Sequence, residues 1–193
     1  MRLFVLARHA ESTLNHQNRI NGDPSVPADL TEAGRAQATL LGQELSGVPV
    51  GFCMHTQFGR TRVTAEIALE GRNVEFREEP LLDDIDVGEL EGWTVDDYRT
   101  WKRGHTRADP FPGGESLDDA ARRYARGFRA VLEVRHDVVL VVSHEIPIRY
   151  ALNGAAGSDD LDAPAHAIPN ARPYLFDEAT LERAAERIDQ LAG

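Results

Sequence analysis

Two histidines come directly after apolar runs in this sequence. His9 follows Arg8 and the run over residues 2–7, and His144 follows Ser143 and the run over residues 138–142. Short apolar runs that end in polar residues predict buried strands. Ligands of open α/β sheets gather beyond the carboxyl ends of the strands, so both rings are candidates for one crevice. Either histidine alone is equally well interpreted as a surface residue, but the pair with an arginine beside it is a less ordinary pattern.

The chemistry that suits this set of residues is phosphoryl transfer. A histidine ring can attack phosphorus and form a phosphohistidine, which divides one difficult displacement into two easier steps. The transferring group spreads negative charge over its oxygens and needs cationic donors around them, a role for which the planar, permanently charged guanidinium is well shaped. Arg8 adjoins His9, and Arg60 lies near the start of an expected helix, whose amino terminus would add positive potential. Taken alone, Arg60 fits a surface ion pair better.

The elements that would position these residues alternate between strands and helices. Apolar runs and periodic apolar positions predict strands at 2–7, 50–54, 73–77 and 137–143, and helices at 31–45, 58–69, 94–103 and 117–133. Thr31 is an expected helix cap, and Ser116 with Asp119 an expected capping box. This alternation predicts an α/β fold, a three-layer α/β/α sandwich with a mostly parallel central sheet.

Two stretches of the chain are harder to interpret. Residues 80–92 carry an acidic cluster interrupted by glycines and are expected to form an irregular surface loop. In the tail, residues 172–176 suit a strand whereas residues 178–191 suit a helix by propensity, and the choice between strand and helix stays open.

Composition limits the partners and the domain count. A chain of 193 residues with 41% hydrophobic and 27% charged residues is expected to form one domain over residues 1–193. The net charge of −11 disfavours nucleic acid and anionic lipid, and no apolar run reaches the roughly 20 residues of a membrane span. The lone Cys53 cannot form an internal disulfide, so a reducing cytoplasm is expected. The oligomeric state stays open, a homodimer included.

Five ordered segments of the chain resemble the histidine phosphatases, a family that includes the cofactor-dependent phosphoglycerate mutases. The first, LARHAESTLNHQNRINGDPSVPADLTEAGRAQA, is similar to that family's opening signature. The others, in order, are FGRTRVTAEI, LLDDIDVGELEG, FPGGES and VVLVVSHEIPIRYAL. Each is weak alone, but five in sequence with matching strands and helices identify the chain as a member and imply a phosphoglycerate mutase-like fold.

The resemblance also implies roles for individual residues. His9 would be the phosphorylated nucleophile, with Arg8, Arg60 and His144 around the phosphoryl oxygens. The residues it places near the substrate are Asn15, Asn21 and Gly22. Without the resemblance, Asn21 and Gly22 would be interpreted only as a turn.

Three positions depart from the family pattern. The family's acid is normally a glutamate four residues before the loop glycine, a position taken here by the shorter Asp84. Glu145 follows His144 where this branch more often has glycine, and an acid at that place resembles the proton donor of the acid-phosphatase branch. Asp84 is therefore the first candidate for the general acid, and Glu145 is the second. If Glu145 is not the acid, it is expected to lie near the substrate. Ala10 replaces a usual glycine and is expected to matter little.

The expected activity is hydrolysis of a small phosphomonoester through a phosphohistidine on His9. No metal site or cofactor is expected, because HExxH pairs, paired cysteines and Walker loops are missing from the sequence and the other histidines are scattered. Two alternatives remain, a phosphoglycerate mutase-type transfer and a non-catalytic phosphate-binding regulatory protein. The mutase would have to exclude water from the phosphohistidine.

Overall fold

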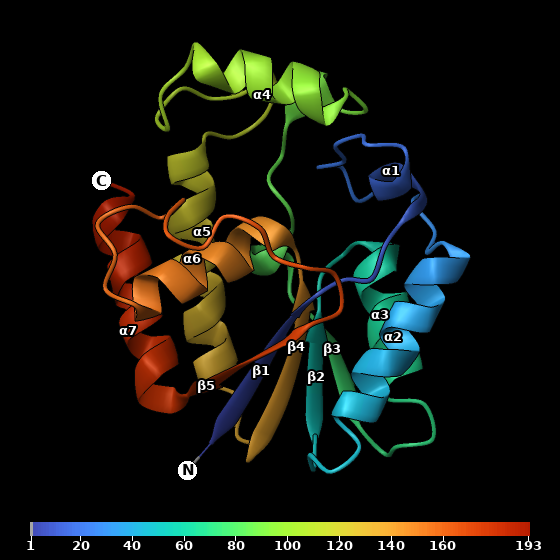
Figure 1. Ribbon diagram of the computed structural model, residues 1–193. Helices are drawn as coiled ribbons and strands as arrows, with labels where there is room; N and C mark the ends of the chain where they lie inside the picture. Colours follow the sequence, from blue (N-terminus) through green and yellow to red (C-terminus); the bar gives the residue numbers. More distant parts are fainter. Residues whose placement is uncertain (1) are drawn as a thin grey trace.

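A five-stranded sheet organises the chain in the computed structural model, which describes residues 2–193 (Figure 1). The strand order is β3-β2-β4-β1-β5. The strands are β1 (Leu3–Arg8), β2 (Phe52–His55), β3 (Glu75–Glu78), β4 (Val138–Ser143) and β5 (Pro173–Asp177). All neighbours pair in parallel except β5, which runs antiparallel to β1. The mostly parallel sheet expected from the sequence is confirmed.

Helices cover both faces of the sheet and make the three layers (Figure 1). On one face lie α2 (Glu32–Glu44) and α3 (Gly59–Ala68), and on the other α5 (Leu117–Leu132), α6 (Glu145–Ala155) and α7 (Glu178–Leu191). Successive side chains of a strand point to opposite faces. Accordingly, Val139 and Val141 of β4 pack into the core under α5 to α7, whereas Leu140 and Val142 pack into the core under α2 and α3.

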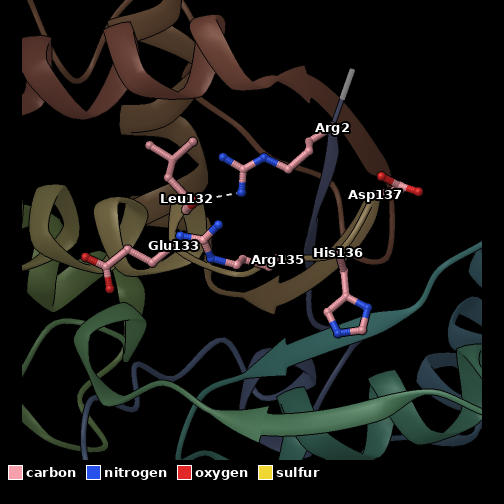
Figure 2. Close-up of a pocket in the computed structure, with 6 residues that line it drawn as sticks. All are labelled: Arg2, Leu132, Glu133, Arg135, His136 and Asp137. Carbon is pink, nitrogen blue, oxygen red and sulfur yellow. Dashed lines mark hydrogen bonds between the residues drawn. The ribbon is translucent and has the colours of Figure 1, made fainter.

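Helix ends are satisfied by the residues that the sequence marks for this purpose. Thr31 caps α2 by accepting from the Gly34 amide, and Ser116 with Asp119 forms the capping box of α5. At the other end of α5, Arg2 donates to the Leu132 carbonyl at 2.7 Å (Figure 2) and, just beyond the helix, to the Val134 carbonyl at 2.8 Å. The first bond occupies a carbonyl that a helix end leaves without a partner.

Residues 80–92 are not the surface loop that their charge suggested. Two 3₁₀ turns, Pro80–Leu82 and Gly88–Leu90, interrupt the segment. Four of its apolar side chains, those of Leu82, Ile85, Val87 and Leu90, are buried in the larger core. The acidic residues masked this apolar pattern, because the segment alternates in burial without a helical or strand period.

Three further findings complete the arrangement. The short helix α1 (Thr13–His16) and the whole of α6 were not expected; Pro147 lies in the first turn of α6, where a missing amide hydrogen removes no helical bond. The expected helix at 94–103 is confirmed as α4 (Val95–Arg103), which begins after its cap Thr94. The open choice in the tail is resolved as both elements, β5 followed by α7.

None of the helices in residues 2–193 is long and apolar enough to cross a bilayer.

Candidate active site

The two histidines meet because their strands are neighbours. In the parallel pair of β1 and β4, Arg8 lies opposite Ser143, so the residues that follow them leave the sheet side by side. The His9 amide donates to the Ser143 carbonyl at 2.9 Å. The two ring centroids are 5.3 Å apart, and the rings meet edge to face. Both residues are buried, His9 at 2% and His144 at 0% exposure. The alternative interpretation of either one as a surface histidine is therefore wrong.

The ring of His9 is oriented with one nitrogen toward the other polar residues. Its Nδ1 lies 2.8 Å from the Ala10 carbonyl, an acceptor, which places the ring hydrogen on Nδ1 and leaves a lone pair on Nε2. Burial lowers the pKa of His9 well below its ordinary value, and the charges of Arg60 and Arg8 lower it further. The ring is therefore neutral at neutral pH and has its Nε2 lone pair available as a nucleophile.

Arg60 is the central cation of the site. It lies in the first turn of α3, is 4% exposed, and stacks over the Phe58 ring at 4.2 Å. Its Nε donates to His9 Nε2 at 3.1 Å, and Nη2 lies 3.3 Å from His144 Nδ1. Nη1 donates to Asn21 Oδ1, and Nη2 donates to the Asn21 carbonyl at 3.1 Å. The interpretation of Arg60 as part of a surface ion pair is therefore wrong.

His144 is held between Thr56 and the polar cluster. Its Nε2 lies 2.9 Å from Thr56 Oγ1, and its Nδ1 lies 3.4 Å from Asp84 Oδ2. Burial lowers the pKa of His144 well below its ordinary value, and the Arg60 charge adds to this effect. Thr56 was missed in the sequence. It follows β2 as His9 follows β1, so the rule on carboxyl ends of strands would have selected it.

Arg8 lies at the side of the site that faces α6. Its Nη1 donates to the Ile168 carbonyl at 2.8 Å and is 2.7 Å from Glu145 Oε2. Glu145 is the first residue of α6, and its Oε1 is 3.4 Å from Arg149 Nη1. Arg8 and Glu145 thus form an ion pair with each other beside the two histidines.

The two acid candidates occupy different positions. Asp84 lies at the centre, with Oδ2 3.3 Å from Arg60 Nη2, whereas Glu145 contacts the arginines at the edge. Burial raises the pKa of Asp84, although the Arg60 charge acts in the opposite direction. A raised pKa keeps more of the carboxyl in its protonated form, which is the form a general acid needs. Burial also raises the pKa of Asp83 to about 6, but its Oδ1 accepts from the Gln57 amide instead.

The three residues expected near the substrate are placed differently from one another. Asn21 contacts Arg60, as described above. The Gly22 amide donates to Glu91 Oε2 at 2.7 Å, and a β-carbon on Gly22 would lie 2.1 Å from the Ile85 carbonyl oxygen. Asn15 takes part in the capping box of α1, with its Oδ1 3.1 Å from the Ser12 amide. No hydrogen bond within residues 2–193 joins Asn15 to either histidine or to Arg60.

Glu91 is a second residue that the sequence interpretation missed. Its carboxylate accepts from Asn21 Nδ2 at 2.9 Å, from the Gly22 amide and, at 3.0 Å, from the Asp23 amide. Three donors on one carboxylate hold the turn that carries Asn21 against Arg60. The acidic motif contained Glu91, but nothing local distinguished it from the solvated carboxylates around it.

A separate hollow lies at the amino ends of strands β1 and β4. It has a volume of about 450 Å³ and is lined by residues that precede β1 and β4, among them Arg2, Arg135 and His136 (Figure 2). The histidine pair follows the same strands, so the two places lie at opposite ends of them. The Arg2 guanidinium in this hollow already has protein partners, the carbonyls of Leu132 and Val134 and the Glu178 carboxylate.

Comparison with known proteins places the chain in a family. Residues 4–188 match the histidine phosphatase superfamily (branch 1). Phosphoserine phosphatase 1 of Hydrogenobacter thermophilus is 35% identical over 168 residues, which cover 81% of this chain and 77% of that protein. The 2,3-bisphosphoglycerate-dependent phosphoglycerate mutase 2 of Gloeobacter violaceus is 34% identical over 167 residues, 79% of this chain and 74% of that protein.

The solved structures agree at the level of fold. The alpha-ribazole phosphatase of Shigella flexneri superposes with a TM-score of 0.79 at 23% identity, over 91% of this chain and 90% of that one. Since the family match extends over nearly all of the described residues and two relatives exceed 30% identity, the chain belongs to the histidine phosphatase superfamily.

Proposed function

We propose that the protein is a phosphatase that hydrolyses a small phosphomonoester in two steps. In the first, His9 Nε2 attacks phosphorus and the ester P–O bond breaks, while Asp84 gives its proton to the departing oxygen. In the second, water attacks the phosphohistidine and gives a proton to the Asp84 carboxylate, the P–N bond breaks, and inorganic phosphate leaves. The observation that carries the proposal is the buried His9 ring, whose Nε2 lies 3.1 Å from Arg60 Nε beside His144.

The surrounding residues suit the charge that develops on phosphorus. Arg60 would transfer its Nε hydrogen bond from the His9 lone pair to a phosphoryl oxygen as that lone pair attacks. With a hydrogen on Nδ1, His144 can donate to a second oxygen while its Nε2 accepts from Thr56, 2.9 Å away. Preorganised donors of this kind stabilise the transition state without having to reorganise during the reaction.

Asp84 is the better placed of the two acid candidates. Its carboxyl group touches both Arg60 and His144, so it lies beside the position of a phosphate bound between them. Its raised pKa favours the protonated form that donation requires. Both oxygens of Glu145, by contrast, face the guanidinium groups of Arg8 and Arg149 at the edge of the site.

The relatives support hydrolysis and leave a second candidate. One is named for phosphoserine phosphatase activity, which is hydrolysis of a small phosphomonoester. Another is named as a phosphoglycerate mutase, so transfer within phosphoglycerate is the second candidate function. The two differ in the fate of the phosphohistidine, which water cleaves in a phosphatase and a second substrate oxygen cleaves in a mutase.

A panel of small phosphate esters, assayed for phosphate release and for isomerisation of 3-phosphoglycerate, tests the proposal. We expect phosphate release by the wild type and its loss in His9→Ala, with His136→Ala at the opposite edge of the sheet retaining activity. Isomerisation without phosphate release would favour the mutase. Phosphate binding without turnover of p-nitrophenyl phosphate, whose leaving group needs little acid assistance, would identify a binding protein and reject catalysis.

A further inference from the structure

Glu145 is fixed between two arginines at the start of α6. Its Oε2 is 2.7 Å from Arg8 Nη1, and its Oε1 is 3.4 Å from Arg149 Nη1. Arg149 is itself anchored, because Nη1 donates to the His166 carbonyl at 3.1 Å and Nη2 lies 3.0 Å from Asp162 Oδ1. The two arginine side chains are 17% and 14% exposed, so the carboxylate between them is held by largely buried groups.

These contacts occupy Nη1 of the Arg8 guanidinium and do not involve its Nε. Nη1 serves both Glu145 and the Ile168 carbonyl, the latter at 2.8 Å. The Arg8 Nε is buried and has no hydrogen-bond partner among residues 2–193. A buried charged donor without an acceptor is unfavourable, so this N–H is suited to an anionic oxygen that arrives with the substrate. Arg8 directly precedes His9 in the chain, and its charge contributes to lowering the pKa of that ring.

Glu145 acts on the leaving-group acid through its charge. Its carboxylate raises the pKa of Asp84, whereas Arg60 and Arg8 lower it. Like charges disfavour a second ionised carboxyl nearby, so Glu145 opposes the loss of the Asp84 proton. The ion pair therefore offsets part of the effect of the Arg8 charge on Asp84.

We propose that Glu145 is a positioning residue, which holds Arg8 by Nη1 so that the unpaired Nε faces the phosphoryl group. This inference rests on the proposed phosphatase function and deepens it. Glu145 acts through Arg8 and does not itself transfer a proton. The acid that replaces the more usual glycine thus has a role different from that of a donor.

Glu145→Gln tests the role, because it removes the charge and keeps the size of the side chain. For an alkyl phosphate we expect KM to rise about tenfold, the effect of weakening one charge-assisted hydrogen bond. We also expect the alkaline limb of the kcat profile to move to lower pH, while the profile for p-nitrophenyl phosphate keeps its position. Glu145→Asp should bring KM and the alkaline limb part of the way back to their wild-type values, since it restores the charge.

Glu66→Gln is the matched control. Glu66 forms an i,i+4 ion pair with Arg62 at 2.8 Å on the exposed side of α3, as Glu145 does with Arg149 on α6. This variant should match the wild type in KM and in pH profile. Thermal unfolding of each variant, followed by circular dichroism, shows whether a loss of activity comes from a loss of fold.

Three outcomes separate this inference from its rivals. A fall in alkyl phosphate turnover of about 10²-fold or more at unchanged KM in Glu145→Gln would make Glu145 the proton donor and overturn the positioning role. Wild-type KM and pH profile in that variant would overturn it as well. Hydrolysis that survives in His9→Ala would instead reject the proposed phosphatase mechanism, whatever Glu145 does.

Discussion

Replacing Asp84 by asparagine isolates the proton donated to the leaving group. The asparagine side chain has almost the same size as the carboxyl group. Its oxygen can still accept the hydrogen bond that the Ile85 backbone N–H donates to Asp84 Oδ1 at 3.1 Å. At the other position asparagine presents an N–H donor to Arg60 Nη2, which lies 3.3 Å from Asp84 Oδ2, so this contact is lost together with the acidic hydrogen. Loss of the contact should affect all substrates alike, whereas loss of the acidic hydrogen should affect mainly substrates with a poor leaving group.

The size of the effect should depend on the leaving group. General acid catalysis contributes a factor of about 10² to 10⁴, which corresponds to about 3–5 kcal/mol in the barrier. We expect a loss of this size in kcat for an alkyl phosphate, whose departing alkoxide is strongly basic. For p-nitrophenyl phosphate the loss should stay within about threefold, because the phenolate leaves with little assistance from an acid.

The pH dependence gives a second reading of the same substitution. Burial raises the pKa of Asp84, so the wild type should keep its protonated acid to a higher pH than an ordinary aspartate would. With an alkyl phosphate, kcat should fall as the pH rises through this pKa. In Asp84→Asn the alkaline limb should disappear, because no proton remains to be lost there.

Stopped-time phosphate release with both esters across the pH range provides the assay, and Asp83→Asn provides the control. Asp83 is the neighbouring carboxyl, with a pKa raised to about 6, but it accepts from the Gln57 amide at 2.9 Å and not from the residues around His9. Equal losses for both esters in Asp84→Asn would refute the reasoning, since acid assistance would not be what was removed. A larger loss in Asp83→Asn would assign the proton to that residue.

Three further substitutions or conditions test the packing and the charges of the site. Gly22→Ala places a β-carbon 2.1 Å from the Ile85 carbonyl, so we expect a destabilisation of about 1–3 kcal/mol by urea unfolding and a lower kcat; unchanged values would mean that the turn has room to move. Phe128→Ala, at 1% exposure in the larger core, should cost about 3–5 kcal/mol in the same measurement while kcat per folded molecule is kept, and a cost below about 1 kcal/mol would contradict its place in the core. Because the pKa values of His9 and His144 are lowered in the folded protein, the unfolded chain takes up protons first as the pH falls, and stability should decrease between about pH 7.5 and pH 6 by about 0.8 kcal/mol per histidine. His9→Gln should remove its share of this decrease in the urea midpoint, and an unchanged slope would show that the ring is not kept neutral by the fold.

The elements with strong local signals were predictable from the sequence. The apolar run of β4, the Thr31 cap of α2 and the capping box of α5 all lie where their residues indicate. Residues 80–92 and α6 were interpreted less well. In the first, buried apolar side chains alternate irregularly with acids, and in the second a proline in the first turn obscures the helical pattern.

The histidine pair was selected by sequence, but two other residues of the site were not. Thr56 and Glu91 contact His144 and Asn21 through hydrogen bonds between segments far apart in the chain. The rule on the carboxyl ends of strands would have selected Thr56, which follows β2, but one acid among several carries no local mark of such a contact. Arg60 was selected through the family resemblance, although its position at the start of a helix also suits a surface ion pair; its burial, at 4% exposure, is a result of packing.

The sequence by itself determined the alternation of strands and helices, the family and the side chains able to transfer a phosphoryl group, because apolar period, caps and residue chemistry are properties of short segments. Only the tertiary structure decided which of these side chains meet and in what ionisation state. Strand order brings His9 and His144 to a centroid distance of 5.3 Å, and burial then shifts the pKa values of both rings and of Asp84. Distances and desolvation arise from packing between remote segments, so neither can be deduced from the sequence of one segment alone.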